Sequence, residues 1–147
     1  MEKETIRQIQ RKIVQLLHKN NNKPLYVTSV DNCSEVARLA GCWIFEKLPL
    51  AKIYILKGKN ILKTKRCHDI LAVDYSENIT LIDPTVWQFF KNKKSIFIKT
   101  TNSLANSLFE ANKLYGGKWE ISEILSKDDC KKSEFKRIIA LNIKELK

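Results

Sequence analysis

The feature that most constrains this chain is a β-hairpin pattern near its middle. A run rich in apolar residues extends from His68 to Tyr75, and a second such run ends at Asp83. Between them lies a short polar turn at Ser76 and Glu77. Two strand-like runs joined by so short a turn are typical of neighbouring antiparallel strands. The pattern therefore predicts a small antiparallel sheet in the centre of the sequence.

The turn also predicts which side chains of this hairpin meet. If Ser76 and Glu77 form a two-residue loop, Tyr75 pairs with Asn78, and Asp83 then lies opposite Ile70. Paired residues lie on the same face and alternate residues share a face, so His68 and Asp83 become diagonal neighbours. Diagonal neighbours are ~7–8 Å apart at the backbone, which lets a carboxylate reach an imidazole. We therefore expect a His68–Asp83 pair.

A second pattern predicts a helix that begins with a cysteine. Asp31 and Asn32 are favoured N-cap residues, and Cys33 follows them directly. Apolar residues then recur at steps of three and four: Val36, Leu39, Ala40, Trp43 and Ile44. We expect the helix to run to about Phe45 with this face buried. A thiol at a helix N-terminus is favoured as thiolate by the helix dipole.

The other three cysteines are interpreted differently. No two cysteines form a CxxC pair, so a zinc ribbon or a redox motif is not expected, and neither is a disulfide framework at this length. Cys42 and Cys130 lie in helical patterns and are interpreted as packing residues. Cys67 alternates with His68 and should face away from it. Cys33 is the predicted reactive cysteine.

These residues predict the roles of a catalytic triad. Cys33 would be the nucleophile, His68 would accept and return a proton, and Asp83 would orient the imidazole. The Cys33 backbone N–H would hold the oxyanion together with a second donor. The candidates for this donor are Asn32 or, as alternatives, Tyr26 and Thr28.

The remaining patterns predict an α+β fold. With 147 residues, we expect a single domain over residues 1–147. An amphipathic helix should end near residues 20–22, and the middle of the chain should form the sheet. The further expected elements are strands at 51–56 and 95–99, a helix capped by Thr100 or Thr101 and ended by Gly116 and Gly117, and a last helix from about Asp128. The segment 119–121 is left unassigned.

Composition and charge limit which partners and which cellular location we expect for this protein. Hydrophobic content is 44%, and no apolar run approaches the length of a membrane span. The charged start at residues 1–4 is unlike a signal peptide, so we expect a cytoplasmic protein or one delivered into a target cell by a specialised system. The formal net charge is +11. Two lysine-rich stretches without acidic residues, 47–66 and 91–99, flank the proposed site. They would form either an electropositive rim or a solvated basic surface.

The order of these residues resembles the papain-like fold. A cysteine at a helix start, then His68 opening a strand, then Asp83-Pro84 ending the next strand are similar to papain-fold toxin domains of bacterial polymorphic toxins and to glutamine-deamidating effectors. The run from Ile82 to Thr85 is also similar to transglutaminase-like enzymes and to peptidase domains of bacteriocin exporters. The segment from Tyr115 to Trp119 is similar to a toxin C-terminus.

The resemblance implies a cysteine hydrolase with the N-terminal helices, the small sheet and the C-terminal helices of that fold. It implies a protein substrate, deamidase or peptidase activity, no metal or organic cofactor and, for a toxin, a cognate immunity protein. Papain-like peptidases carry a glutamine six residues before the cysteine, where this chain has Val27. The alternatives are a basic nucleic-acid-binding module and a non-catalytic adaptor. Nucleic-acid binding is not expected, because aromatic–basic interleaving and a helix-turn-helix signature are absent from the sequence.

Overall fold

The computed structural model describes residues 1–146, which form one antiparallel sheet and five α-helices. The strands are β1 (Lys52–Lys59), β2 (His68–Tyr75), β3 (Asn78–Asp83), β4 (Phe97–Thr101) and β5 (Lys118–Ile124). The helices are α1 (Lys3–Leu17), α2 (Leu25–Thr28), α3 (Cys33–Lys47), α4 (Leu104–Tyr115) and α5 (Lys132–Lys144). Three short 3-10 helices are η1 (Ile61–Lys63), η2 (Val86–Gln88) and η3 (Lys127–Asp129). The strand order is β4-β3-β2-β1-β5.

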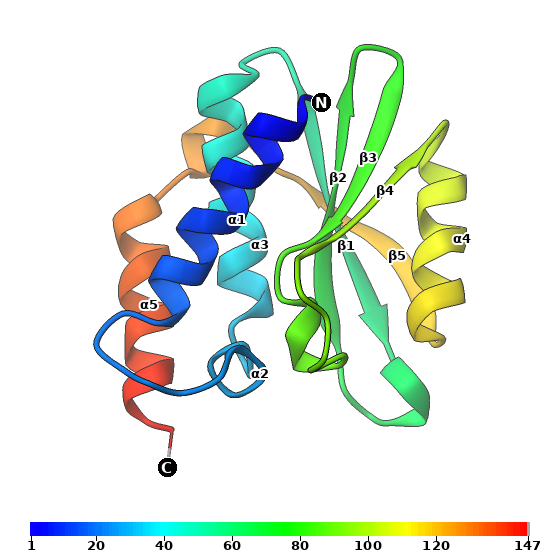
Figure 1. The fold of residues 1–147 in the computed structure, drawn as a ribbon. Helices are drawn as coiled ribbons and strands as arrows, with labels where there is room; N and C mark the ends of the chain where they lie inside the picture. Colours follow the sequence, from blue (N-terminus) through cyan, green and yellow to red (C-terminus); the bar gives the residue numbers. More distant parts are fainter. Residues whose placement is uncertain (147) are drawn as a thin grey trace.

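The helices are divided unequally between the two faces of the sheet. Helices α1, α3 and α5 lie together on one face, and α4 covers the other (Figure 1). This arrangement confirms the predicted α+β class. Helices α1 and α3 have 15 residues each. In the described part of the chain, no helix has both the length and the apolar character needed to cross a bilayer.

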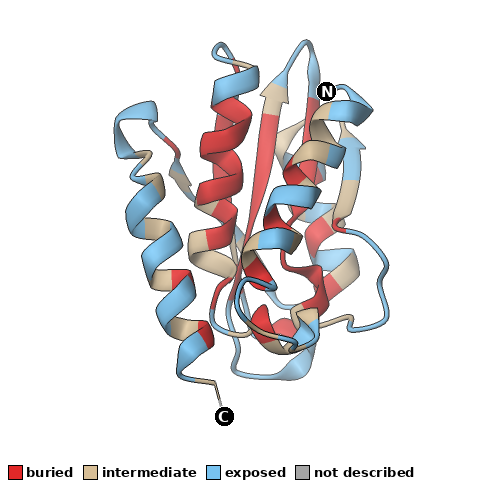
Figure 2. Cartoon of the chain, turned by 60° about the vertical axis from the view of Figure 1, so that its left-hand side comes forward, coloured by how far each residue is buried: buried red, intermediate tan, exposed pale blue. Residues whose placement is uncertain are grey.

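The larger apolar core lies between α3 and the sheet. From β1 and β2, Ile53, Ile55, Leu71 and Val73 point into it and are almost wholly buried. Helix α3 is buried along most of its length (Figure 2). Fully burying an aliphatic side chain of this size stabilises a fold by roughly 1.5–3 kcal/mol. Helix α3 is therefore firmly fixed against the strands that carry the proposed site.

A smaller core lies under α4 on the opposite face. Leu56, Ile70, Ala72 and Leu81 of the sheet are buried there with Ala111 of α4. Alternate residues of a strand share a face, so the row formed by Ala72 and Ile70 continues to His68 at the start of β2. The imidazole therefore lies at the end of the α4-facing core.

The hairpin has the predicted register. Tyr75 pairs with Asn78, and Leu71 pairs with Ile82. Ser76 and Glu77 form the two-residue turn, with φ values of 54° and 65°. Positive φ at both central residues is the conformation of the turns that suit the twist of a hairpin. The loop therefore has an even number of residues, which is the condition for His68 and Asp83 to lie on the same face.

Three expectations about the later part of the chain need correction, the first being the start of the last helix, which is Lys132 rather than about Asp128. The fourth strand begins at Phe97 rather than at residue 95, because the Ile96 N–H donates to Gln10 Oε1 at 3.0 Å instead of joining the sheet. Ser103, not Thr100 or Thr101, caps α4 by accepting from the Asn106 N–H. The unassigned segment 119–121 belongs to β5, which pairs with β1 at the edge of the sheet.

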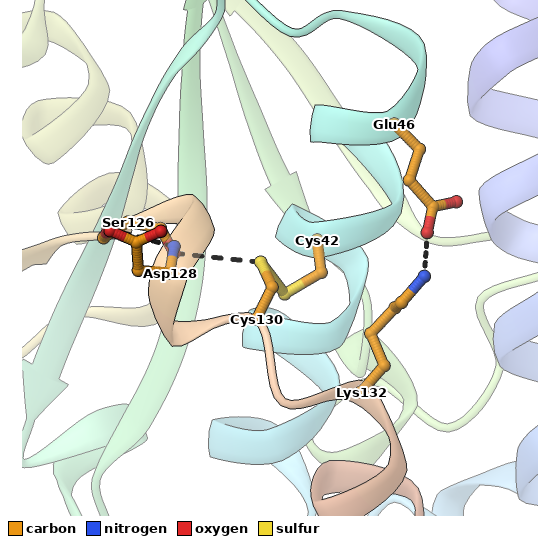
Figure 3. The surroundings of a disulfide bond; sticks show 6 residues. All are labelled: Cys42, Glu46, Ser126, Asp128, Cys130 and Lys132. Carbon is orange, nitrogen blue, oxygen red and sulfur yellow. Dashed lines mark hydrogen bonds and ion pairs between the residues drawn. A yellow bond between two sulfur atoms is a disulfide. The ribbon is translucent and has the colours of Figure 1, made fainter.

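The interpretation of Cys42 and Cys130 as packing residues is wrong, because the two form a disulfide (Figure 3). Their Cα atoms are 5.5 Å apart, within the usual range for a disulfide. Cys130 follows η3 and is not part of a helix. The bond ties the buried face of α3 to the segment before α5, and a Lys132–Glu46 ion pair lies beside it.

Candidate active site

His68 and Asp83 meet inside the protein. His68 begins β2 and Asp83 ends β3, and both side chains have no exposed surface. The distance from His68 Nε2 to Asp83 Oδ2 is 2.7 Å, within the range of a charge-assisted hydrogen bond. The structure therefore brings together the predicted histidine and aspartate.

Asp83 accepts two further hydrogen bonds. The Thr85 backbone N–H donates to Oδ1 at 3.0 Å, across the turn at Pro84. The Tyr115 hydroxyl donates to Oδ2, the oxygen that also binds His68. A buried carboxylate is costly unless its lone pairs are used, and these three donors use them. The carboxylate is therefore held in one orientation.

The pKa of His68 is raised from its ordinary 6.5 to about 10. Burial lowers it, because a charged ring loses its hydration, but the Asp83 charge and hydrogen bond more than offset this effect. The nearby Cys33 raises it further. The imidazole is therefore cationic at neutral pH.

The Cys33 side chain is half-buried at the first position of α3. Since Nε2 of His68 binds Asp83, the nitrogen left for the thiol is Nδ1. Among residues 1–146, Nδ1 is buried and has no partner that meets ordinary hydrogen-bond geometry. Cys33 nevertheless lies near enough to affect the His68 pKa. Catalytic hydrogen bonds are often long before a substrate binds.

The N-terminus of α3 is open. Asn32 occupies the N-cap position, but its side chain makes no capping hydrogen bond, contrary to the expected role. In the described chain, the backbone N–H groups of Cys33, Ser34 and Glu35 have no acceptor. Unpaired N–H groups and the helix dipole favour negative charge at this point. They can stabilise a thiolate or an oxyanion.

Asn32 instead connects three helices. Its Nδ2 donates to the Thr28 carbonyl of α2 at 2.7 Å, and its Oδ1 accepts from Asn142 of α5 at 2.9 Å. The side chain is fully buried. Asn32 therefore fixes the start of α3, and its role as oxyanion donor stays a prediction. Of the alternatives, Tyr26 is 44% exposed, whereas Thr28 is fully buried.

An aromatic enclosure surrounds the imidazole. Phe89, Tyr115 and Trp119 have ring centroids 4.8, 5.2 and 6.5 Å from that of His68. Arg66 covers Phe89 at 4.7 Å from the ring centre. These rings exclude water from the ion pair, which strengthens its electrostatic interaction.

A second polar network lies on the opposite face of β2, next to the site. Arg38 of α3 donates to Asp69 Oδ2 at 3.1 Å, to the Ser34 hydroxyl at 2.6 Å and to Glu123 of β5. Asp69 follows His68 in the chain, and Ser34 follows Cys33. The network therefore fixes the first turn of α3 relative to the start of β2.

The sequence did not point to Tyr115, Phe89 and Trp119 as parts of the site. They come from the end of α4, from the residue after η2 and from β5. The only local signal was the segment around Gly116 and Gly117, which follows Tyr115. Within residues 1–146, no group of three or more His, Cys, Asp or Glu side chains is placed to hold a metal ion.

The site has no counterpart in the comparisons with known proteins. No protein-family model, curated protein or solved structure matches this chain.

Proposed function

We propose that this protein is a papain-like cysteine enzyme that acts on a protein substrate through Cys33, His68 and Asp83. The observation that supports this most strongly is His68, a wholly buried imidazole near the free Cys33 thiol. One of its nitrogens binds Asp83, and the other has no partner among residues 1–146. A core histidine with only a packing role would have both nitrogens satisfied. The proposed triad has the division of roles found in cysteine and serine hydrolases.

The chemistry follows from these roles. The Cys33 thiolate attacks an acyl carbon, and a C–S bond forms as the carbonyl oxygen becomes an oxyanion. When the oxyanion collapses, the C–N bond breaks and His68 gives its proton to the leaving nitrogen. Water then attacks the thioester, His68 takes a proton from it, and the acid product and the thiolate are released. Ammonia leaves in a deamidase, and a peptide amine leaves in a peptidase.

The open N-terminus of α3 supports an oxyanion site. The N–H groups of Cys33, Ser34 and Glu35 have no acceptor in residues 1–146 and lie at the positive end of the helix. One donor of this kind contributes about 2.7–4 kcal/mol to the transition state in acyl-transfer enzymes. This feature reduces the need for the glutamine that Val27 replaces.

Charge around the site favours an acidic protein as substrate. The loop before His68 carries exposed Lys63, Lys65 and Arg66, and the loop after η2 carries exposed Lys91 and Lys93. The second loop and Phe89 line a surface hollow of about 400 Å³. Clustered charge of one sign speeds the encounter with a partner of the opposite sign and selects for it.

Toxin or effector status is part of the proposal. It is supported by the resemblance to papain-fold toxins and by the Cys42–Cys130 disulfide, because disulfides persist in oxidising compartments. Export from the producing cell is therefore favoured over a cytoplasmic location. A toxin of this kind implies an immunity protein, which we expect to cover Cys33 and the basic loops.

A glutamine-derived chloromethyl ketone tests the enzyme proposal directly. We expect it to alkylate Cys33 in the wild type and in Cys67→Ala, and to leave Cys33→Ala unlabelled, as read by intact mass. Acidic glutamine-containing peptides then separate the two activities. A deamidase exchanges a side-chain NH₂ for OH, whereas a peptidase shortens the peptide. Equal labelling of Cys33→Ala would contradict the proposal.

The net charge of +11 supports nucleic-acid binding as a second candidate function. Fluorescence anisotropy with random oligonucleotides near 150 mM salt, about physiological strength, tests it. Phosphate binding would weaken linearly with the logarithm of salt concentration for any sequence. We expect no tight binding. Sub-micromolar binding by both wild type and Cys33→Ala would favour this second function.

A further inference from the structure

We propose that Tyr115 is a positioning residue of this site, which acts through Asp83 and limits how firmly that carboxylate holds the proton of His68. The inference rests on the proposed function and deepens it. Tyr115 is 1% exposed, and its hydroxyl donates to Asp83 Oδ2. The same oxygen accepts from His68 Nε2 at 2.7 Å. Two donors therefore compete for the charge of one oxygen atom.

The direction of the effect follows from this competition. The Tyr115 hydroxyl bonds a carboxylate most strongly when no cation neutralises it. The hydrogen bond therefore stabilises the state with neutral His68 more than the state with the imidazolium. Without the hydroxyl, Asp83 would hold the imidazolium more tightly. Tyr115 thus makes it easier for His68 to release its proton to a leaving group.

The groups that face His68 are few. Asp83 from β3 and Cys33 from α3 act on the charge of the ring directly, and Tyr115 from α4 packs against the ring and binds Asp83. Arg66 covers Phe89 from the solvent side. Asp69 and its partner Arg38 lie on the opposite face of β2. Tyr115 is therefore the neutral group best placed to adjust the Asp83–His68 interaction.

The backbone after α4 is built to hold Tyr115 in this place. Gly116 and Gly117 have φ values of 67° and 76°, which side chains rarely adopt. A Cβ at Gly117 would meet the Lys59 carbonyl oxygen. Trp119 then packs on Tyr115 with ring centroids 5.5 Å apart, and its Nε1 donates to the Gly116 carbonyl at 2.9 Å.

A titration of His68 by NMR tests the inference without any substrate. The chain has two histidines, and the exposed His18 serves as an internal reference. We measure the ring signals in a Cys33→Ala background, which removes the thiol's own effect on the titration. Tyr115→Phe should raise the His68 midpoint by about one pH unit. Tyr54→Phe, a buried tyrosine on the same face, should leave it unchanged.

An unchanged or lowered midpoint in Tyr115→Phe would overturn the inference. If that variant does not fold, 3-fluorotyrosine placed at position 115 gives the reverse test. Its more acidic hydroxyl is a stronger donor, so the midpoint should fall, and no change would overturn the inference. With a substrate in hand, Tyr115→Phe should lower kcat about tenfold with little change in KM. The proposed function fails separately, if wild-type Cys33 is no more reactive than Cys67.

Discussion

Helix α3 carries two cysteines in opposite circumstances, one at its N-terminal end and one in its C-terminal half. At the N-terminal end, Cys33 is free, half-buried, and close to a cationic imidazole and to open backbone N–H groups. Nine residues later, Cys42 is buried and bonded to Cys130. The first end leaves a thiol available for reaction, and the second end removes one. We therefore expect the reactivity of each sulfur to depend on its position along the helix and on the groups that surround it.

The polar partners at the two ends differ in the same way. His68 and Asp83 are wholly enclosed by protein, so water does not screen their interaction. The second ring nitrogen of His68 has no partner in the described part of the chain. Lys132 and Glu46, beside the disulfide, are about 40% exposed, so water screens their attraction. We therefore expect the buried His68–Asp83 pair to serve catalysis, and the exposed Lys132–Glu46 pair to serve only to hold α5 against α3.

The largest effect is expected from Asp83→Asn at the reactive end. The asparagine keeps the shape of the side chain but removes the charge that holds the imidazolium, so kcat should fall by about 10³–10⁴-fold. The thermal melting temperature should also fall, because removing one partner of the buried His68–Asp83 pair destabilises the fold, so kcat is measured at a temperature where the variant is folded. Asp74→Asn, at the far end of the same hairpin, is the matched control and should keep full activity. If Asp83→Asn is fully folded at the assay temperature and keeps full activity, Asp83 only supports the turn at Pro84.

The raised pKa of His68 makes stability depend on pH. A pKa raised from 6.5 to about 10 stabilises the fold fully below pH 6.5, and this contribution is lost as the pH rises through about 10. Urea unfolding should therefore show a falling free energy of unfolding between these limits. His68→Gln should flatten the slope, and His18→Gln should not. A slope that persists in His68→Gln would show that other groups cause it.

Breaking the disulfide tests the other end of α3. The bond joins residues separated by 88 positions, so Cys42→Ala should lower the free energy of unfolding by about 2–4 kcal/mol. Reducing the wild type should have the same effect. At temperatures where the variant is folded, Cys33 should keep its alkylation rate. Loss of Cys33 reactivity in the folded variant would show that the two ends are not independent.

The smallest effect is expected from Glu46→Gln. Exposed ion pairs contribute roughly 0–1 kcal/mol, so the free energy of unfolding should fall by less than about 1 kcal/mol. The hydrogen bond from Lys132 lowers the pKa of Glu46. Any contribution is therefore present above pH 4.5 and lost as the pH falls below it. A larger loss, or a loss that does not depend on salt, would show that this pair contributes more to stability than an exposed ion pair does.

Local patterns predicted the parts of the site that neighbouring residues determine. The two-residue turn at Ser76 and Glu77 set the register, and the register put His68 and Asp83 on one face. The periodicity after Cys33 predicted the helix and its first residue. These features depend on a few adjacent residues, which is why the sequence was enough.

Contacts between residues far apart in the sequence could not be predicted from such local patterns. The Cys42–Cys130 bond depends on β5 crossing beside β1, and β5 carries no clear alternation of burial. Tyr115 reaches Asp83 only because α4 packs across the sheet. Asn32 favours an N-cap by type, yet the Thr28 carbonyl and Asn142 engage its side chain instead. The disulfide and the Tyr115 contact join segments far apart in the chain, and for Asn32 alternative hydrogen bonds replaced the expected cap.

The rate at which iodoacetamide modifies Cys33 relative to Cys67 tests the central claim most directly. Both thiols are free in the native protein, and Cys67 is the more exposed of the two. Labelling of the wild type near neutral pH, followed by peptide mass mapping, gives both rates in one sample. We predict that Cys33 reacts faster despite its partial burial, because His68 and the N-terminus of α3 stabilise its thiolate. Equal or faster modification of Cys67 would contradict the account.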